Sequence, residues 1–205
     1  MTGRLQLGIS VIVSTLTVCA LVVNGCGGSR VEGVTTIEPG VVTQSFSDPP
    51  GDVRNASSAP NLAPLIDITS AELSLSTKDA TLRVRTAANI PAGGPQYVHQ
   101  ISYVLEFQPV LGKNATFSIQ INRTENQWSV YENQVEFETP PTVTGDQLTV
   151  VLPLAQLPSL NADFKWRLST WIYLEIVGEG PKKLNDFCPN WSSDWSDVPS
   201  FPKMP

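Results

Sequence analysis

Apolar and polar residues alternate in short runs over much of the chain. Leu82 and Val84, for example, are separated by Arg83 and followed by Arg85. Because successive side chains of a strand point to opposite faces of a sheet, a period of two predicts strands with one buried and one solvated face. We expect about eight such strands, at residues 71–76, 82–85, 103–107, 117–121, 128–130, 135–137, 148–152 and 166–176. Their number and spacing are typical of an all-β fold, an antiparallel β-sandwich of the jelly-roll or immunoglobulin-like kind.

Turn-forming residues separate these runs. Residues 77–79 (Thr-Lys-Asp) lie between the first two strands and are few enough for a hairpin, and residues 144–146 (Thr-Gly-Asp) predict a second turn. Helix signals are scarce. The one candidate is a single turn over residues 153–157, which begins with proline, a residue suited to the first helical position.

The beginning of the chain has a different pattern. Arg4 is followed by a charge-free, mostly apolar run from Leu5 to Val23, and residues 23–26 are Val-Asn-Gly-Cys. A positive start, an apolar middle and small residues before a cysteine describe an export signal. Residues 23–26 resemble the lipobox of bacterial lipoproteins, which implies cleavage before Cys26 and acylation of that cysteine. Two alternatives remain: the run stays uncut as a membrane anchor, or it is an ordinary secretory signal cut nearby.

All three interpretations place residues 30–205 outside the cytoplasm. The expected organisation is a signal peptide at residues 1–25, a lipidated cysteine with a flexible tether at residues 26–47, and a β-sandwich domain with an irregular C-terminal tail at residues 48–205. The tether is expected because this stretch has few large apolar residues. Of the three cysteines only Cys188 lies in the domain, so the lipidated chain has no internal disulfide, and we expect Cys188 to be buried in the core.

The chain is acidic, with a formal net charge of −6. A negative surface disfavours nucleic acid as a partner and also disfavours attachment to anionic lipid head groups. A single acyl chain binds a membrane only weakly, so stable attachment needs the multiply acylated cysteine that the lipoprotein resemblance implies. The expected partners are a bacterial membrane, through Cys26, and a polysaccharide or a cell-envelope protein.

Closely spaced aspartates open the domain. Residues 48–52 are Asp-Pro-Pro-Gly-Asp, and Asp67 precedes the first alternating strand. The carboxylates of Asp48, Asp52 and Asp67 would converge if the opening loop folds back onto that strand, and calcium prefers such oxygen ligands. In the simpler alternative, Asp48 and Asp52 close an Asp-initiated turn, and Asp67 accepts hydrogen bonds from backbone amides.

The same opening carries a family resemblance. An Asp-Pro-x-Gly-Asp start, a spacer and an Asp-Ile pair before the first strand resemble exported bacterial sandwich domains similar to family-9-like carbohydrate-binding modules and DOMON-like domains. The resemblance covers mainly residues 48–88, together with a long strand near the end and an Asp-bearing tail that would return toward the opening loop. It implies a jelly-roll-like sandwich, with a structural calcium or a sugar-binding face in some members.

The tail offers a second candidate site. Residues 185–197 contain Trp191 and Trp195 among three aspartates, one of which is Asp194. Aromatic rings stack on sugar rings, and carboxylates bind sugar hydroxyls. In the alternative that we favour, the two tryptophans pin the tail across one end of the sandwich. Trp171, on the non-core face of the last long strand, is a binding platform if it is exposed and part of the core if the tail covers it.

Signals for catalysis are weak. His99 is the one histidine of the chain, and the sequence has no Gly-x-Ser-x-Gly elbow, phosphate loop or Cys/His metal cluster. Two carboxylates that meet in space, such as Asp52 and Asp194, could still form a hydrolase site. We therefore expect a non-catalytic binding module, and a hydrolase or hydrolase subunit is the alternative.

Overall fold

The computed structural model describes residues 33–90, 98–110, 117–124, 127–132, 135–157, 160, 163–176, 180–189, 195 and 198–202. This part of the chain forms two antiparallel sheets that pack against each other around one apolar core. The expected all-β sandwich is confirmed. Short 3-10 helices are found at η1 (Ala56–Ser58), η2 (Ala63–Leu65) and η3 (Leu154–Gln156).

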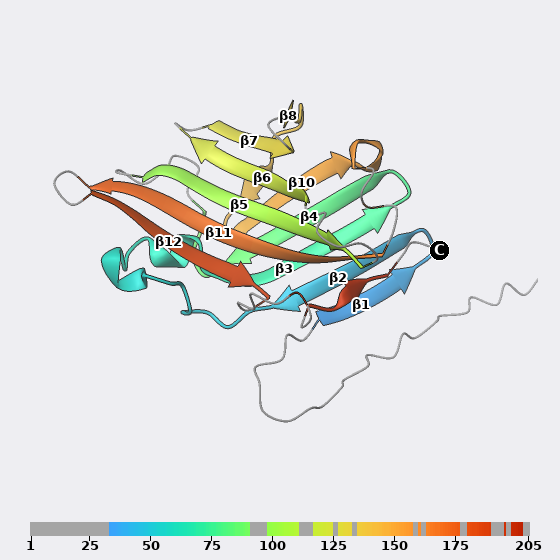
Figure 1. The fold of residues 1–205 in the computed structure, drawn as a ribbon, viewed down its shortest axis with the longest axis horizontal. Helices are drawn as coiled ribbons and strands as arrows, with labels where there is room; N and C mark the ends of the chain where they lie inside the picture. The colour runs from blue at the N-terminus through green and yellow to red at the C-terminus, as the bar shows by residue number, and fades with distance from the viewer. Residues whose placement is uncertain are drawn as a thin grey trace, which may run out of the picture.

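Each sheet contains strands that are distant in sequence. The first sheet has the order β1 (Gly33–Glu38), β2 (Val41–Ser47), β3 (Ile68–Ser76), β4 (Asp79–Thr86), β10 (Gln147–Pro153) and β9 (Thr142–Thr144). The second has the order β12 (Gly180–Cys188), β11 (Phe164–Ile176), β5 (Val98–Pro109), β6 (Phe117–Thr124), β7 (Gln127–Glu132) and β8 (Val135–Glu136), with β13 (Ser200–Phe201) paired to β11. Figure 1 shows the two sheets as layers, with the long strands β5 and β11 side by side in the second sheet.

The alternating pattern decides which side chains are buried. In β4, Leu82 and Val84 are buried, whereas Arg83 and Arg85 are exposed. Trp166 in β11 is fully buried and lies 4.7 Å from Phe46, measured between ring centroids across the two sheets. Removal of this apolar surface from water is the main favourable term in folding, so the period-two pattern specifies the inner faces of both sheets.

The predicted turns are confirmed. β3 and β4 form a hairpin, and the Ser76 hydroxyl accepts hydrogen bonds from the backbone N–H groups of Lys78 and Asp79 at 3.1 and 2.8 Å. The turn between β9 and β10 contains Gly145, whose φ of +61° is a conformation that glycine adopts at little cost. The single helical turn expected over residues 153–157 corresponds to η3.

The expected tether over residues 26–47 is wrong for residues 33–47. These residues form β1 and β2, and β2 pairs along its whole length with β3. Val42 and Phe46 of β2 are buried in the core, but the inward position between them is Gln44, which interrupts the apolar alternation. The sandwich domain therefore begins before residue 48.

The structure also has more strands than the eight or so that the pattern predicts, with thirteen in the described residues. The additional strands are β1, β2, β9, β12 and β13. β9 and β13 are short, β1 has no buried residue, and β2 and β12 carry a polar residue at an inward position, as β12 does at the buried Asp186. A pattern based on apolar residues alone does not detect such strands.

The expected signal peptide and Cys26 lie outside the described residues and stay predictions. Within the residues that the structure does describe, no helix is both long and apolar enough to span a bilayer.

Candidate functional site

The first residues of the site, Asp48 and Asp52, lie in the loop that follows β2 and crosses from the first sheet to the second. Asp48 is held by its backbone N–H, which donates to the carbonyl oxygen of Thr69 at 3.0 Å. Gly51 then turns the chain with a φ of +95°, which favours glycine. The backbone N–H of Arg54 donates to the carbonyl oxygen of Asn185 in β12 at 2.8 Å. The loop thus starts in the first sheet and ends on the second.

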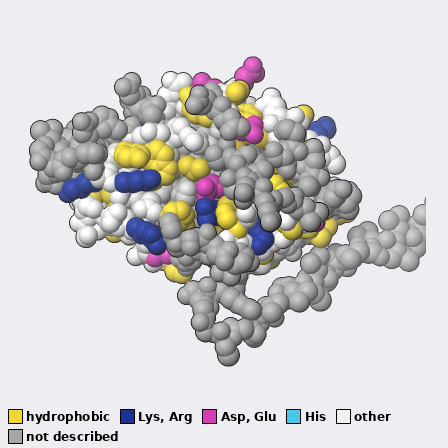
Figure 2. All heavy atoms as spheres, viewed as in Figure 1, with side chains coloured by type: hydrophobic (Ala, Val, Ile, Leu, Met, Phe, Trp, Pro, Cys, Tyr) yellow, Lys and Arg dark blue, Asp and Glu magenta, His cyan; other side chains and the backbone are white. Residues whose placement is uncertain are grey.

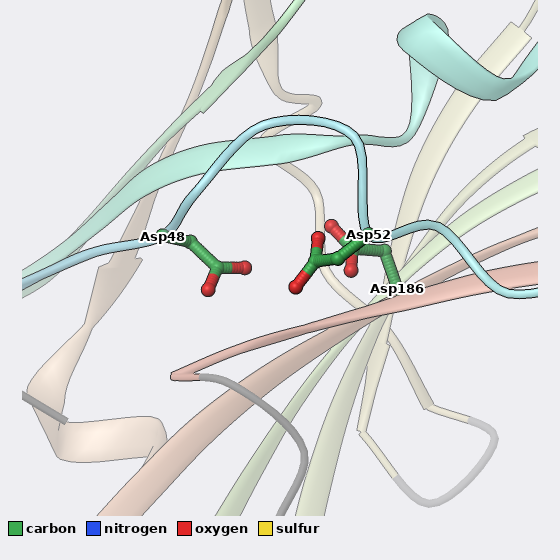
Figure 3. Close-up of side chains that lie close together, drawn as sticks. All are labelled: Asp48, Asp52 and Asp186. Carbon is green, nitrogen blue, oxygen red and sulfur yellow. The ribbon is translucent and has the colours of Figure 1, made fainter. Parts of the chain in front are cut away.

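Three carboxylates converge where this loop meets β12. One side-chain oxygen from each of Asp48, Asp52 and Asp186 lies within 4.8 Å of the others, and we call these residues the carboxylate cluster. Figure 3 shows the carboxyl groups of Asp48 and Asp52 pointing toward each other, with the carboxyl group of Asp186 beside that of Asp52. Asp48 and Asp186 are buried, with 6% and 3% of their surface exposed, whereas Asp52 is exposed.

The hydrogen bonds around the cluster are incomplete. Asp186 Oδ2 accepts a hydrogen bond from the backbone N–H of Ile68 at 2.7 Å, which links β12 to β3 of the opposite sheet. Asp67 Oδ2 accepts one from the N–H of Gly51 at 2.8 Å. Both oxygens of Asp48 and Oδ1 of Asp67 are buried and have no hydrogen-bond partner. A buried carboxylate without a partner is costly, so the site needs a compensating positive charge or a proton.

The pKa values of Asp48 and Asp186 also indicate that these buried carboxyl groups need a proton or a nearby positive charge. Burial, and then the charges of Asp186, Asp52 and Asp67, raise the pKa of Asp48 to about 8. Burial raises the pKa of Asp186 to about 7, although hydrogen bonds from the N–H groups of Ile68 and Phe187 oppose the shift. The cluster therefore does not hold all of its negative charge near neutral pH unless a cation offsets it.

The sequence analysis suggested Asp48, Asp52 and Asp67 as ligands of one calcium ion, and the binding of an ion by any of them stays a prediction. Asp48 and Asp52 converge as expected. Asp67 holds the N–H of Gly51, as in the alternative in which it binds backbone amides, and the third member of the cluster is Asp186. The sequence contained a signal for Asp186, because it occupies the same alternating face as Leu184 and Cys188, where a charged residue is out of place unless it is paired.

A second candidate surface lies on the outer face of the second sheet. Trp171 and Tyr173 point outward from β11, with ring centroids 4.7 Å apart and planes at 87°. Trp171 is partly exposed, and Tyr173 has 39% of its surface exposed. Lys183 Nζ lies 5.3 Å from the centre of the Trp171 ring. We call this surface the aromatic face, and Figure 2 shows hydrophobic side chains next to Lys and Arg side chains over β11 and β12.

Polar side chains border the aromatic face. Trp171 has Asn185 of β12 on one side and Ser102 of β5 on the other. The Ser102 hydroxyl donates to Asn122 Oδ1 at 2.6 Å and accepts a hydrogen bond from Gln100 Nε2 at 3.0 Å. Ser102 is fully buried, so the polar groups of this border that reach the surface are the partly exposed side-chain amides of Gln100, Asn122 and Asn185.

The described part of the tail lies on this same sheet. Trp195 is partly exposed, and the guanidinium carbon of Arg167 is 4.4 Å from the centre of its indole ring. Lys165 Nζ donates a hydrogen bond to the carbonyl oxygen of Trp195. Trp195 thus contacts two outward-facing basic residues near the start of β11. Trp191 and Asp194 lie outside the described residues.

Cys188 is buried and free, as expected. Burial, followed by the nearby charges of Asp48 and Asp186, raises the pKa of its thiol well above the usual value. The thiol stays protonated at neutral pH and is not an activated nucleophile. The side chain of His99 lies outside the described residues.

Comparison of the chain with known protein families, with curated proteins and with solved structures finds no match.

Proposed function

We propose that this protein is a lipid-anchored, non-catalytic module on the extracytoplasmic side of a bacterial membrane, and that its aromatic face binds polysaccharide. The observation that carries the proposal is the outward-pointing pair of Trp171 and Tyr173, whose rings meet edge to face on a sheet surface. Trp171 is partly exposed and Tyr173 is exposed, and adjoining aromatic surface that solvent reaches on one face is typical of a binding site.

Carbohydrate fits the chemistry of this face. A sugar ring has apolar C–H faces that pack on an indole or phenol ring, and hydroxyl groups around its edge that need hydrogen-bond partners. The side-chain amides of Asn185, on the neighbouring strand β12, and of Asn122, two strands away on β6, are partly exposed and can supply both donors and acceptors. Lys183 adds a positive charge next to the rings, which would favour a sugar that carries a carboxylate or sulfate.

The carboxylate cluster by itself does not favour the hydrolase alternative, and Asp194, which that alternative pairs with Asp52, lies outside the described residues. Glycosidase carboxyl groups stand about 5–9 Å apart on either side of the scissile bond, with room between them for substrate or water. The oxygens of the carboxylate cluster converge within 4.8 Å, and Asp48 is buried. This geometry suits an ion better than a sugar ring.

The test is a binding screen with the full chain, purified in detergent, against cellulose, chitin, xylan, starch and peptidoglycan. We expect one polysaccharide class to bind, and we expect Trp171→Ala to weaken that binding about tenfold or more, because interface aromatics of this kind often dominate affinity. Val151→Ala is the control, because Val151 is an exposed apolar residue on the first sheet, with 41% of its surface accessible. If none of the polysaccharides binds, or if both variants bind like the unmodified chain, the proposal is wrong. Specific capture of an envelope protein that Trp171→Ala abolishes would favour the protein-partner alternative.

A further inference from the structure

We infer that Asp48, Asp52 and Asp186 bind one calcium ion, which fastens the loop after β2 to β12. The inference is independent of polysaccharide binding. It rests on the position of the three carboxylates and on the state of Asp48.

The first step is the convergence of the oxygens. Three carboxylates from a loop and from a strand of the opposite sheet bring oxygens within 4.8 Å of one another. A separation of this size allows one ion to contact all three at the 2.3–2.6 Å typical of calcium–oxygen bonds, given small adjustments. Figure 3 shows that the carboxyl group of Asp48 is directed into the space that Asp52 and Asp186 share.

The second step is that Asp48 has no other partner. It is 94% buried, since 6% of its surface is exposed, and neither of its oxygens has a hydrogen bond. Buried polar groups are almost always satisfied, so two orphan oxygens on one carboxylate indicate a ligand that binds there. Asp67 Oδ1, also buried and without a hydrogen bond, offers a further oxygen close to the loop.

The third step is the choice of ion. The converging donors are all carboxylate oxygens, which suit calcium or magnesium and not the metals that prefer sulfur or imidazole. Magnesium demands a nearly regular octahedron of about six short bonds, whereas calcium accepts six to eight oxygens in irregular arrangements. Donors from an irregular loop therefore favour calcium, with backbone carbonyls and water to complete its coordination.

The position of the ion gives it a structural role. Asp48 directly follows β2 of the first sheet, and Asp186 is a residue of β12 in the second, so one ion would join the two sheets. Asn185, the neighbour of Asp186, pairs with Trp171 in the aromatic face. The ion would thus also fix one border of that surface.

The experiment measures calcium binding and thermal unfolding of the full chain in detergent. We expect saturable binding of one calcium ion per chain by equilibrium dialysis with radioactive calcium. We also expect the melting temperature to rise by about 4 °C or more when calcium is well above its dissociation constant, and to fall again with EGTA. Magnesium at the same concentration should raise it less.

Asparagine variants at the cluster make the test specific. Asp52→Asn is the first choice because Asp52 is exposed and its replacement leaves the core intact. We expect it to weaken calcium binding about tenfold or more, since calcium affinity depends on the number of carboxylate ligands. Glu72→Gln is the matched control, because Glu72 is a surface carboxylate on β3 that pairs with Arg83.

The behaviour without calcium distinguishes an ion site from an ordinary structural contact. Asp48→Asn replaces a buried carboxyl group that has no hydrogen-bond partner with a neutral amide of the same shape, so in EGTA it should melt at the same temperature as the unmodified chain or higher, while its response to calcium is reduced. The inference is overturned if calcium neither binds nor stabilises the chain, if Asp52→Asn and Asp186→Asn bind calcium as Glu72→Gln does, or if magnesium acts equally. Trp171→Ala should bind calcium normally, so a failure of the polysaccharide proposal would not affect this result.

Discussion

The indole Nε1 of Trp166 donates a hydrogen bond of 2.7 Å to Oε1 of Gln44, from the second sheet to the first. The amide nitrogen of Gln44 in turn donates to Ser200 O at 3.1 Å and to Thr35 Oγ1 at 3.2 Å. The side chain of Gln44 is buried, and both its amide oxygen and its amide nitrogen are hydrogen-bonded to other residues of the protein. It connects β1, β11 and β13 through one side chain.

Replacement of Gln44 should show how strongly this link stabilises the fold. Gln44→Leu leaves the buried indole N–H without an acceptor, so we expect the free energy of unfolding to fall by about 1–3 kcal/mol. Trp166→Phe also destabilises, because it removes buried surface. The double variant should be less destabilised than the sum of the two single variants, since it contains no orphan N–H group. Urea unfolding of the four proteins gives the coupling, and strict additivity would contradict this account.

The deletion of β1 and β2 tests where the domain begins. A chain that starts at residue 48 lacks Val42 and Phe46 and leaves β3 as an uncovered edge. We expect it to lose cooperative unfolding or to aggregate, because exposed edge strands and lost core surface favour association. A chain that starts at residue 33 is the control and should unfold cooperatively. Equal stability of the two chains would restore the tether over residues 33–47.

The lipid anchor makes a separate prediction about Cys26. Cys26→Ser removes the thiol that acylation requires, so the variant should incorporate no labelled palmitate and should leave the membrane fraction. Cys188→Ser is the control, because Cys188 is buried in the domain and should not affect labelling. Unchanged membrane association of Cys26→Ser would instead support the uncut anchor, whereas release of both proteins into the medium would support an ordinary secretory signal.

The sequence predicts a strand where the apolar residues of the alternating pattern are the ones that the fold buries. The inner faces of β3 and β10 are apolar, and that of β4 is apolar up to Thr86 at its end, so the sequence predicts these three strands. β2 and β12 could not be found in this way, because Gln44 and Asp186 occupy inward positions and are stabilised by partners distant in sequence. The pairing order of the strands also depends on such distant contacts.

The same limit applies to the candidate site. The spacing of Asp48 and Asp52 within one short loop makes their proximity predictable. Their approach to Asp186 depends on a bridge between Arg54 and Asn185, which lie far apart in the chain. The order of residues near Asp48 and Asp52 gives no information about that distant contact. Asp67, the next aspartate along the chain, is therefore predicted as the third ligand.

Asp67 should act on the cluster through Gly51 rather than as a main ligand. Its Oδ2 accepts the hydrogen bond from the Gly51 N–H at 2.8 Å, and this bond holds the turn between Asp48 and Asp52. Asp67→Asn keeps a carbonyl oxygen for that bond, whereas Asp67→Ala removes it and leaves a cavity.

We therefore expect Asp67→Ala to lower the melting temperature in EGTA and to weaken calcium binding severalfold, because the loop loses its position. Asp67→Asn should retain most of the calcium affinity and should melt in EGTA close to the unmodified chain, since it keeps the bond and removes a negative charge near Asp48. The comparison is made by thermal unfolding and calcium dialysis on the two variants in parallel. If Asp67→Asn loses as much calcium affinity as Asp52→Asn, Asp67 is a direct ligand and the loop-positioning role is wrong.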